Sequence, residues 1–410
     1  MKQIINHFTD TDLYTLSVAL VVMNKFPRAH IKYNFFDRNN SVYSEEFVEE
    51  LNKQIKLMAN IVPTDEEINF LKEKCYYFPN YFFDYLKSYR FNPDEVTVTR
   101  DEAGHLSIVI EGLWFRTIFW EVPLLAMISE IEHTLNGDID KIFGNKELFD
   151  KNLRDSYERA EKLLQNGVVF SDFGTRRRFS FEWQKNVLES FVLASTTNCT
   201  AKGCFVGTSN IYLAMVMNKE LDANLKIIGT MSHQLPCSVA AMYGPVEANS
   251  LTMQLWRDVY GTDLGIYLYD GLTWDAFECN FTKLDAKAFD GLRVDSGDNF
   301  EMTDKIIAKY HKLGINPYNK TIVYSNGLDV DDAIAINNYC RGKVQCSFGI
   351  GTKFTCNLTD VKPKNIVIKA TDIKITEKRK WNHVIKLSDD LGKHTGDAET
   401  IEIYKKLLHL

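Results

Sequence analysis

The stretch that decides the fold is Lys226-Ile227-Ile228-Gly229-Thr230-Met231-Ser232-His233-Gln234. Its short apolar run predicts a buried strand, and the glycine predicts the end of that strand. His233 would then lie on the loop beyond the carboxyl end, where ligands and catalytic residues collect in α/β proteins. A single loop histidine more often bonds a nearby carbonyl group. The case for a site therefore depends on the neighbouring loops.

The same pattern occurs seven times between residues 168 and 352. Each time, a short apolar run leads into a turn of small, polar or acidic residues, and a helix-like segment follows. The apolar runs are Val168–Phe170, Cys204–Val206, Ile227–Ile228, Ile266–Tyr269, Leu292–Val294, Ile322–Tyr324 and Cys346–Phe348. Successive βα units of this kind form a parallel barrel or a doubly wound sheet. We favour the barrel, because polar chemistry in every turn is expected when all turns face one site.

The segments on either side of this region have a different pattern. We expect helices over 12–23, 44–59, 124–135 and 148–165, and another opened by the capping box of Thr64 and Glu67. Strands are predicted over 31–36, 96–99, 106–110, 366–370, 373–376 and 383–387. The basic turn 377–380 should be a solvated loop. The late strands are expected to join the early ones in a second layer.

Composition bounds the class of protein. The chain has 410 residues and a net charge of −7, which argues against a general nucleic-acid binder. Its eight cysteines include no Cys-x-x-Cys pair and no zinc-site spacing, so no metal-ligating residues are assigned. The start does not resemble a signal peptide, and no apolar run is long enough to span a bilayer. We expect a cytoplasmic protein with reduced thiols and no membrane contact.

Three of the turns have chemistry suited to a phosphorylated ligand. Gly349-Ile350-Gly351-Thr352 offers backbone N–H groups and a hydroxyl to a phosphate, and Ser325-Asn326-Gly327 offers a second such loop. Arg293 and Asp295 flank Val294 and therefore point to one face of a strand. Arg293 can clamp a phosphate or carboxylate, while Asp295 can hold ribose hydroxyls or a Mg²⁺-bound water. A structural ion pair at a strand end would explain these two residues equally well.

Two further features complete the candidate site. Phe173 precedes Arg176, Arg177 and Arg178, so an aromatic ring could stack on a planar ligand while an arginine meets its carboxylate. A solvated basic helix start is the alternative, and we expect at least one arginine to do only that. His233 can act as a general base, a donor to a leaving phosphate or a phosphoryl acceptor. Asp270, after the next strand, can bind the far ring nitrogen and fix the tautomer.

With these residues the chain resembles the bacterial nicotinate phosphoribosyltransferases, which are type II phosphoribosyltransferases. The resemblance extends from residue 11 to residue 388 and is densest in five motifs: 173–180, 205–210, 229–233, 295–298 and 347–352. It implies an irregular parallel α/β barrel, residues 126–359, with an open-faced α+β sandwich domain built from residues 1–125 and 360–410. It also implies a homodimer with shared active sites.

The implied activity is that of an ATP-dependent ligase and pentosyltransferase. Such an enzyme forms nicotinate mononucleotide and pyrophosphate from nicotinate and phosphoribosyl pyrophosphate, with Mg²⁺ and coupled ATP hydrolysis, in the salvage route of NAD biosynthesis. By this resemblance His233 is phosphorylated by ATP. Tyr14 of the partner subunit and Phe173 would hold the pyridine ring. The remaining implied contacts are Thr230 and Arg293 to nicotinate or sugar phosphate, Asp295 to ribose, and Ser325, Asn326, Gly351 and Thr352 to the 5′-phosphate.

One departure and two alternatives accompany the resemblance. Many relatives carry Glu where this chain has Gln234, so no helper role for that carboxylate is carried over. The sister enzymes that use nicotinamide carry an acid where this chain has Ser209, and Asp would accept a bond from an amide but repel a carboxylate. A catalytically silent barrel that binds a phosphorylated metabolite is the alternative from another class.

Overall fold

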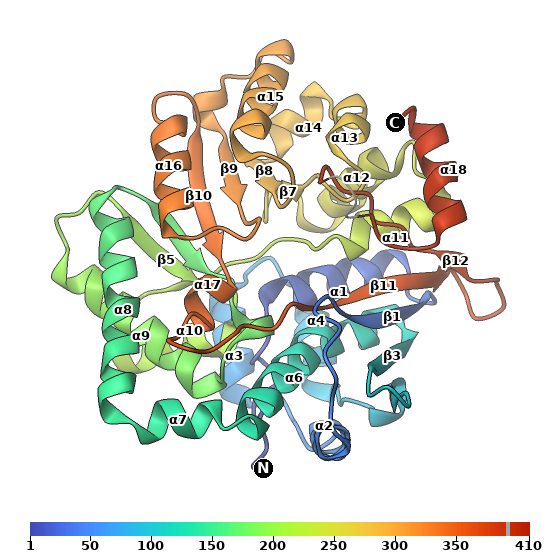
Figure 1. Cartoon of the computed structure of the whole chain (residues 1–410). Helices are drawn as coiled ribbons and strands as arrows, with labels where there is room; N and C mark the ends of the chain where they lie inside the picture. Colours follow the sequence, from blue (N-terminus) through green and yellow to red (C-terminus); the bar gives the residue numbers. More distant parts are fainter. Residues whose placement is uncertain (391–393) are drawn as a thin grey trace.

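The protein is described by a computed structural model over residues 1–390 and 394–410. Two sheets organise it: a parallel sheet of seven strands and an antiparallel sheet of five (Figure 1). The parallel sheet has the strand order β6-β5-β4-β10-β9-β8-β7. Its strands are β4 (Val169–Asp172), β5 (Cys204–Thr208), β6 (Lys226–Ile227), β7 (Ile266–Leu268), β8 (Gly291–Val294), β9 (Thr321–Tyr324) and β10 (Gln345–Ile350).

The parallel sheet curls into a barrel that stays open on one side. Its first and last strands, β4 and β10, pair in parallel, with Phe170 opposite Phe348. No strand pairing in the described part of the chain joins β6 to β7. All seven predicted strands are present, and the barrel interpretation is confirmed. All seven carboxyl ends therefore face one side, where the turns meet.

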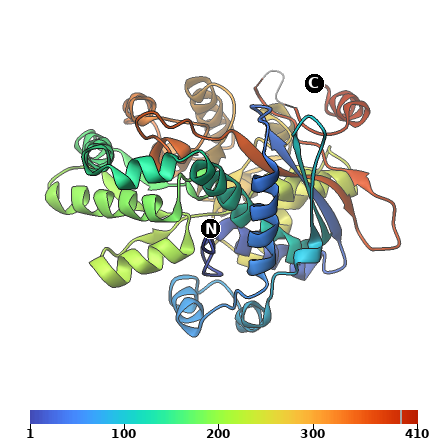
Figure 2. The same ribbon diagram turned by 60° about the horizontal axis from the view of Figure 1, so that its bottom comes forward.

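Helices cover the outside of the barrel, because each returns the chain to the start of the next parallel strand. In Figure 2 the helices coloured green, α8 to α10, lie on one side and the antiparallel sheet on the other. The helices after β4 are α9 (Phe181–Thr197), α10 (Ile211–Leu221), α11 (Gln234–Tyr243), α12 (Ala248–Tyr260), α13 (Trp274–Asn280), α14 (Lys283–Ala288), α15 (Asn299–Lys312), α16 (Val330–Cys340), α17 (Thr352–Thr355) and α18 (Ala398–Leu408).

The antiparallel sheet joins both ends of the chain, as predicted, in the order β12-β11-β1-β3-β2. Its strands are β1 (His30–Asp37), β2 (Val96–Arg100), β3 (Leu106–Leu113), β11 (Ile366–Lys374) and β12 (Asn382–His383). Two expectations were wrong. Residues 366–370 and 373–376 belong to a single strand, because a bulge opposite Lys32 and Tyr33 absorbs the polar Thr371. A strand was predicted over 383–387, but the strand in this region, β12, is only Asn382–His383.

The five helices predicted before the barrel are all present, and three shorter helices that were not predicted accompany them. Together they are α1 (Leu13–Lys25), α2 (Glu45–Met58), α3 (Asp65–Lys74), α4 (Asn80–Ser88), α5 (Trp114–Thr117), α6 (Glu121–Leu135), α7 (Asp138–Gly144) and α8 (Lys146–Gln165). Thr64 and Glu67 form the predicted capping box of α3. Asp12 occupies the N-cap of α1 but makes no capping bond, because its carboxylate accepts the Ser209 hydroxyl instead, 2.7 Å away.

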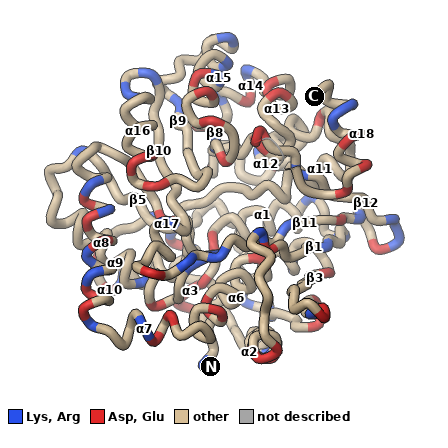
Figure 3. The backbone as a smooth tube through the Cα atoms, in the orientation of Figure 1, with Lys and Arg blue, Asp and Glu red and all other residues tan. Residues whose placement is uncertain are grey.

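Charge is spread over the surface in both signs (Figure 3). The turn 377–380 is exposed, as predicted, and shows as a basic tip beyond β12. Within residues 1–390 and 394–410, no helix is long and apolar enough to cross a membrane. The predicted boundary between residues 125 and 126 falls inside α6, and the domain division itself stays a prediction.

Candidate active site

Two adjoining cavities of about 740 and 270 Å³ lie at the carboxyl ends of the parallel strands. Six residues line both cavities and form the wall between them: Phe173, Arg176, Ser232, His233, Arg293 and Asp295. The larger cavity adds the late turns and β11, and the smaller one adds α1 and the ends of β5 and β6. The predicted site residues therefore converge on one place.

His233 ends the loop after β6 and directly precedes α11. Its Nε2 lies 2.9 Å from the Oδ1 of Asp270, which is fully buried after β7. Burial opposes ionisation of Asp270, but His233 and Lys386 outweigh it and hold the pKa of this carboxyl well below its ordinary value. An ionised carboxylate only accepts, so Nε2 carries the proton. The pairing inferred from strand order is confirmed, and it leaves Nδ1 as the unprotonated nitrogen.

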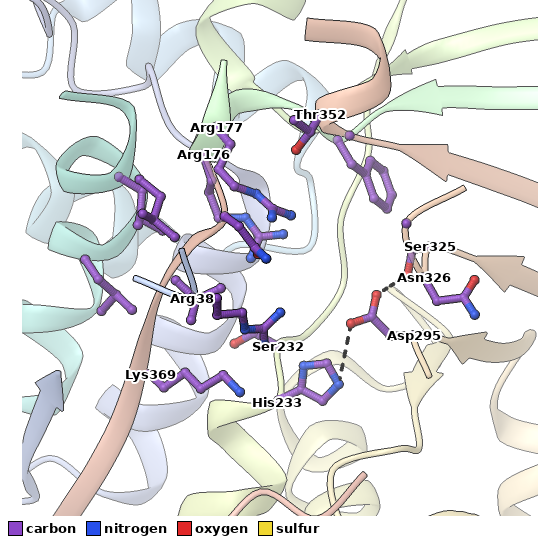
Figure 4. A pocket seen from close by; sticks show the side chains of 18 of the residues that line it. Arg38, Arg176, Arg177, Ser232, His233, Asp295, Ser325, Asn326, Thr352 and Lys369 are labelled. Atoms are coloured by element: carbon purple, nitrogen blue, oxygen red, sulfur yellow. Dashed lines mark hydrogen bonds and ion pairs between the residues drawn. The ribbon is translucent and has the colours of Figure 1, made fainter. Parts of the chain in front are cut away.

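Arg293 and Asp295 form one hydrogen-bonded unit with Ser325. The Arg293 guanidinium donates from Nη2 to Asp295 Oδ1 at 3.1 Å and from Nε to Ser325 Oγ at 2.7 Å. Ser325 in turn donates to the same carboxylate oxygen at 2.5 Å. Burial opposes ionisation of Asp295, yet Arg293 and His233 lower its pKa. Arg293 and Asp295 both face the cavities (Figure 4 shows Asp295). The two residues therefore form an ion pair and are also placed to contact a ligand.

The smaller cavity has the size and lining of a site for one aromatic ring. Tyr14, Phe173, Arg176, Ser209 and Thr230 all line it. The Arg176 guanidinium lies 5.7 Å from the centre of the Tyr14 ring, and the Arg293 guanidinium lies 5.6 Å from the centre of the Phe173 ring. Two aromatic side chains and two cations therefore surround the space that a planar anion would fill.

Tyr14 reaches this cavity from the same chain. The resemblance implies that Tyr14 of a partner subunit also reaches the ring, and that contribution stays a prediction. The start of α1 lies against the end of β5, because the Leu13 N–H donates to the Ser209 carbonyl at 3.0 Å. It also touches the turn after β6, where a methyl group on Gly229 would lie 3.2 Å from the Tyr14 nitrogen. One chain thus supplies both ring-facing aromatics.

The phosphate-type turns line the larger cavity. Ser325, Asn326, Gly351 and Thr352 all border it, with Thr352 opening α17 (Figure 4). Gly349 lets Phe173 pack against β10, because a methyl group there would lie 2.2 Å from the Phe173 ring. The late barrel turns thus present polar atoms to the same space as His233.

The three consecutive arginines have different surroundings. Arg176 faces both cavities and Arg177 faces the larger one. Arg178 is fully buried and forms a two-armed ion pair with Asp10, at 2.7 and 2.8 Å. The expectation that one arginine would be merely solvated was wrong, because Arg178 ties the segment before α1 to the barrel.

A cationic wall that was not predicted from the sequence is formed by Arg38, Arg177 and Lys369. These side chains line the larger cavity together and face Asp295, Ser325 and Asn326 across it (Figure 4). None of the three forms a salt bridge with any residue that the structure describes. Burial, with Lys386 and Arg38 nearby, lowers the pKa of Lys369 to about 8. Burial and the adjacent Arg176 likewise lower the pKa of Arg177 to about 10. Arg38 is exposed, Arg177 and Lys369 are half-buried, and Lys369 also donates to the Thr395 hydroxyl at 3.3 Å. Cations that line a cavity with no carboxylate at salt-bridge distance are suited to bind an anion.

Comparisons with known proteins agree with this geometry. The family model described as the nicotinate phosphoribosyltransferase (NAPRTase) family matches residues 168–409, and the model of its N-terminal domain matches residues 9–129. Nicotinate phosphoribosyltransferases from Desulforapulum autotrophicum and Chromohalobacter salexigens are both 38% identical to this chain. The matches cover 98% of this chain in both cases, and 99% and 97% of the respective relatives.

Solved structures give the same result. The nicotinate phosphoribosyltransferase of Porphyromonas gingivalis superposes with a TM-score of 0.91 at 36% identity, covering 99% of this chain and 100% of that one. The Vibrio cholerae enzyme superposes with a TM-score of 0.85 at 26% identity, covering 100% of this chain and 94% of that one. The matches in sequence and in structure both extend over nearly the whole chain, so this chain belongs to the nicotinate phosphoribosyltransferase family.

Proposed function

We propose that this enzyme transfers the phosphoribosyl group of phosphoribosyl pyrophosphate to nicotinate, forming nicotinate mononucleotide and pyrophosphate for NAD salvage. The observation that carries the proposal is the shared wall of the two cavities. A ring-sized cavity between Tyr14 and Phe173 adjoins a larger cationic cavity, and His233, Arg293 and Asp295 stand between them. A pyridine ring and a sugar phosphate would meet at that wall.

The transfer forms a bond between the pyridine nitrogen and C1′ of the ribose as the bond from C1′ to pyrophosphate breaks. Positive charge develops on the sugar and negative charge on the leaving group, so fixed charges near both lower the barrier. Tyr14 and Phe173 would hold the ring in line, while Asp295 would bind the ribose hydroxyls. The turns at 325–326 and 351–352 would hold the 5′-phosphate, and Arg38, Arg177 and Lys369 would receive the pyrophosphate.

ATP coupling through His233 is part of the proposal. Because Nε2 is bonded to Asp270, Nδ1 would attack the γ-phosphorus, forming an N–P bond while the bond to ADP breaks. The phosphate would add negative charge and acceptor oxygens next to Asp295. Mg²⁺ would enter with the pyrophosphate and neutralise its charge. Asp295 is the carboxylate suited to meet it, since Arg293 and Ser325 bond only its Oδ1, whereas His233, Ser296 and Lys386 engage both oxygens of Asp270.

An assay of the purified protein with nicotinate, phosphoribosyl pyrophosphate, Mg²⁺ and ATP tests the proposal. Formation of nicotinate mononucleotide in equal amount with pyrophosphate is the expected result. Binding of phosphoribosyl pyrophosphate without turnover would instead identify a silent barrel. The homodimer with shared active sites, including the contribution of the partner's Tyr14 to the ring site, stays a prediction.

Ser209→Asp should lower the activity of the enzyme with nicotinate relative to nicotinamide. Ser209 lines the ring cavity and donates to Asp12 at 2.7 Å, so a carboxylate there would repel both Asp12 and the carboxylate of the substrate. We expect kcat/KM for nicotinate to fall about 100-fold, which corresponds to roughly 3 kcal/mol, and the ratio of nicotinamide to nicotinate use to rise. Ser209→Ala, which adds no charge, is the control and should cost less than about tenfold. An unchanged preference in Ser209→Asp would contradict the assignment of this cavity to the pyridine ring.

Lys369→Met should raise KM for phosphoribosyl pyrophosphate about tenfold at neutral pH, because one charge-assisted contact is lost. The pKa of Lys369 is lowered to about 8, so its charge is present below that pH and is lost above it. In the wild type KM should therefore rise as the pH passes this value, and the variant should lose that dependence. Lys378→Met, in the exposed turn, is the matched control. If both variants gave the same KM, the cationic wall would not be the pyrophosphate site.

A further inference from the structure

Glu121, the first residue of α6, is a buried acid that the mechanism above does not use. Its side chain borders the larger cavity, next to Gln234, the residue that follows His233. Gln234 Nε2 donates to Glu121 Oε2 at 3.4 Å, and Arg176 Nη1 lies 3.9 Å from Oε1. Glu121 is only 8% exposed. It is therefore a nearly buried carboxylate next to Arg176, the arginine that lines the ring cavity.

Arg176 is approached by more negative charge than it can balance. Asp12 lies 3.7 Å from its guanidinium in addition to Glu121, and Asp295 is a more distant acid. The Tyr14 and Tyr33 hydroxyls are the other titratable groups near Glu121. Nicotinate would bring a further carboxylate to this cluster, and Arg293 is the other cation that lines the ring cavity. A buried cluster with that excess of negative charge is costly unless one acid takes up a proton.

We propose that Glu121 takes up a proton from solvent when nicotinate binds. Neutral Glu121 no longer balances the positive charge of Arg176, so that charge can pair with the substrate carboxylate. The inference rests on the proposed function, and Glu121 acts through Arg176 as a positioning residue. The proton would sit on Oε1, because Oε2 already accepts from Gln234.

The hydrogen bonds identify Glu121, rather than Asp12, as the acid that protonates. Asp12 accepts a 2.7 Å bond from Ser209, which stabilises its ionised form. Glu121 accepts a longer bond of 3.4 Å from Gln234, and the nearby Tyr14 hydroxyl adds some support for its ionised form. Burial, opposed by Arg176, raises the pKa of Glu121 to about 7, so it can change charge near neutral pH.

Gln234 contacts Glu121 without adding a second negative charge next to it. Its amide oxygen accepts from Tyr33 at 2.7 Å and from Trp114 at 3.0 Å. Its amide nitrogen can donate to Glu121 in either protonation state. A Glu at this position would put a second carboxylate next to Glu121. The amide therefore adds no third acid to Asp12 and Glu121 around Arg176.

The test is kcat/KM for nicotinate as a function of pH, at saturating phosphoribosyl pyrophosphate. Because the protonated form binds the anion, kcat/KM should be full at low pH and should fall as the pH rises through the pKa of Glu121. The wild type should lose about 20-fold between about pH 6.5 and about pH 8.5. Glu121→Gln, which is neutral throughout, should change less than about twofold over the same range. The same fall in both proteins would overturn the inference.

A second measurement keeps the inference testable if Glu121→Gln does not fold. Calorimetric titration of the wild type with nicotinate, in buffers of different ionisation enthalpy at about pH 8, should show uptake of close to one proton. No uptake would overturn the inference, as would uptake lost in Asp12→Asn but kept in Glu121→Gln. Absence of any turnover of nicotinate by the wild type would instead reject the proposed function.

Discussion

Asp270→Asn should slow phosphorylation of His233 by about 1000-fold, because the asparagine no longer holds a proton on Nε2. In the wild type, the Asp270 carboxylate accepts from His233 at 2.9 Å and from Ser296 at 2.6 Å. These contacts fix both the tautomer and the direction of the ring. Without them the free nitrogen would spend most of its time protonated or misdirected. The loss should appear as a slower rate and not as a weaker affinity for ATP.

The measurement is a time course of acid-labile label from γ-labelled ATP, mapped to His233 by peptide analysis. Asp258→Asn is a suitable control, since Asp258 forms only a surface ion pair with Lys25. Label incorporated at the wild-type rate in Asp270→Asn would contradict the assigned role of Asp270. Label on another residue would reject His233 as the phosphoryl acceptor.

Arg293→Gln should lower kcat/KM for phosphoribosyl pyrophosphate by about 1000-fold. Arg293 contacts Asp295 and Ser325 and faces both cavities, so its removal takes away a positive charge and frees two side chains that it holds. Removal would also leave Asp295 without its strongest neighbouring cation. Both effects act at the wall where the bond to C1′ changes.

Arg293→Lys separates charge from geometry. Lysine keeps the charge but cannot donate to Asp295 and Ser325 from one planar fork, so a loss of about 100-fold is expected. Arg341→Lys, on the exposed loop after α16, should have no effect. Wild-type kinetics in Arg293→Lys would show that only the charge matters and that the hydrogen-bonded unit is dispensable.

The barrel could be predicted because its signal is local. Each strand is a short apolar run that ends in a turn. Strand order then places His233 near Asp270, and the alternation of side chains along one strand places Arg293 next to Asp295. The cationic wall could not be predicted in this way. Arg38 precedes Lys369 by more than three hundred residues, and they meet only because β1 pairs with β11. Glu121 was hidden for another reason: an acid at the start of a helix is ordinary.

The place of Tyr14 shows a different limit. The motif around it was recognised, but the motif alone does not show that the start of α1 packs against the ends of β5 and β6. That packing depends on the bond between Leu13 and Ser209 and on the close approach at Gly229. Neither contact has a signature in the order of residues.

The closure of the barrel by β4 and β10 has a consequence for how the protein is made. Helix α1 is apolar around most of its circumference and is synthesised before every strand of the barrel. The barrel that it packs against cannot close until β10 has been synthesised, more than three hundred residues later. At ordinary translation rates the helix would wait for roughly tens of seconds. During that time the exposed apolar surface of α1 needs a chaperone or a temporary partner within the growing chain.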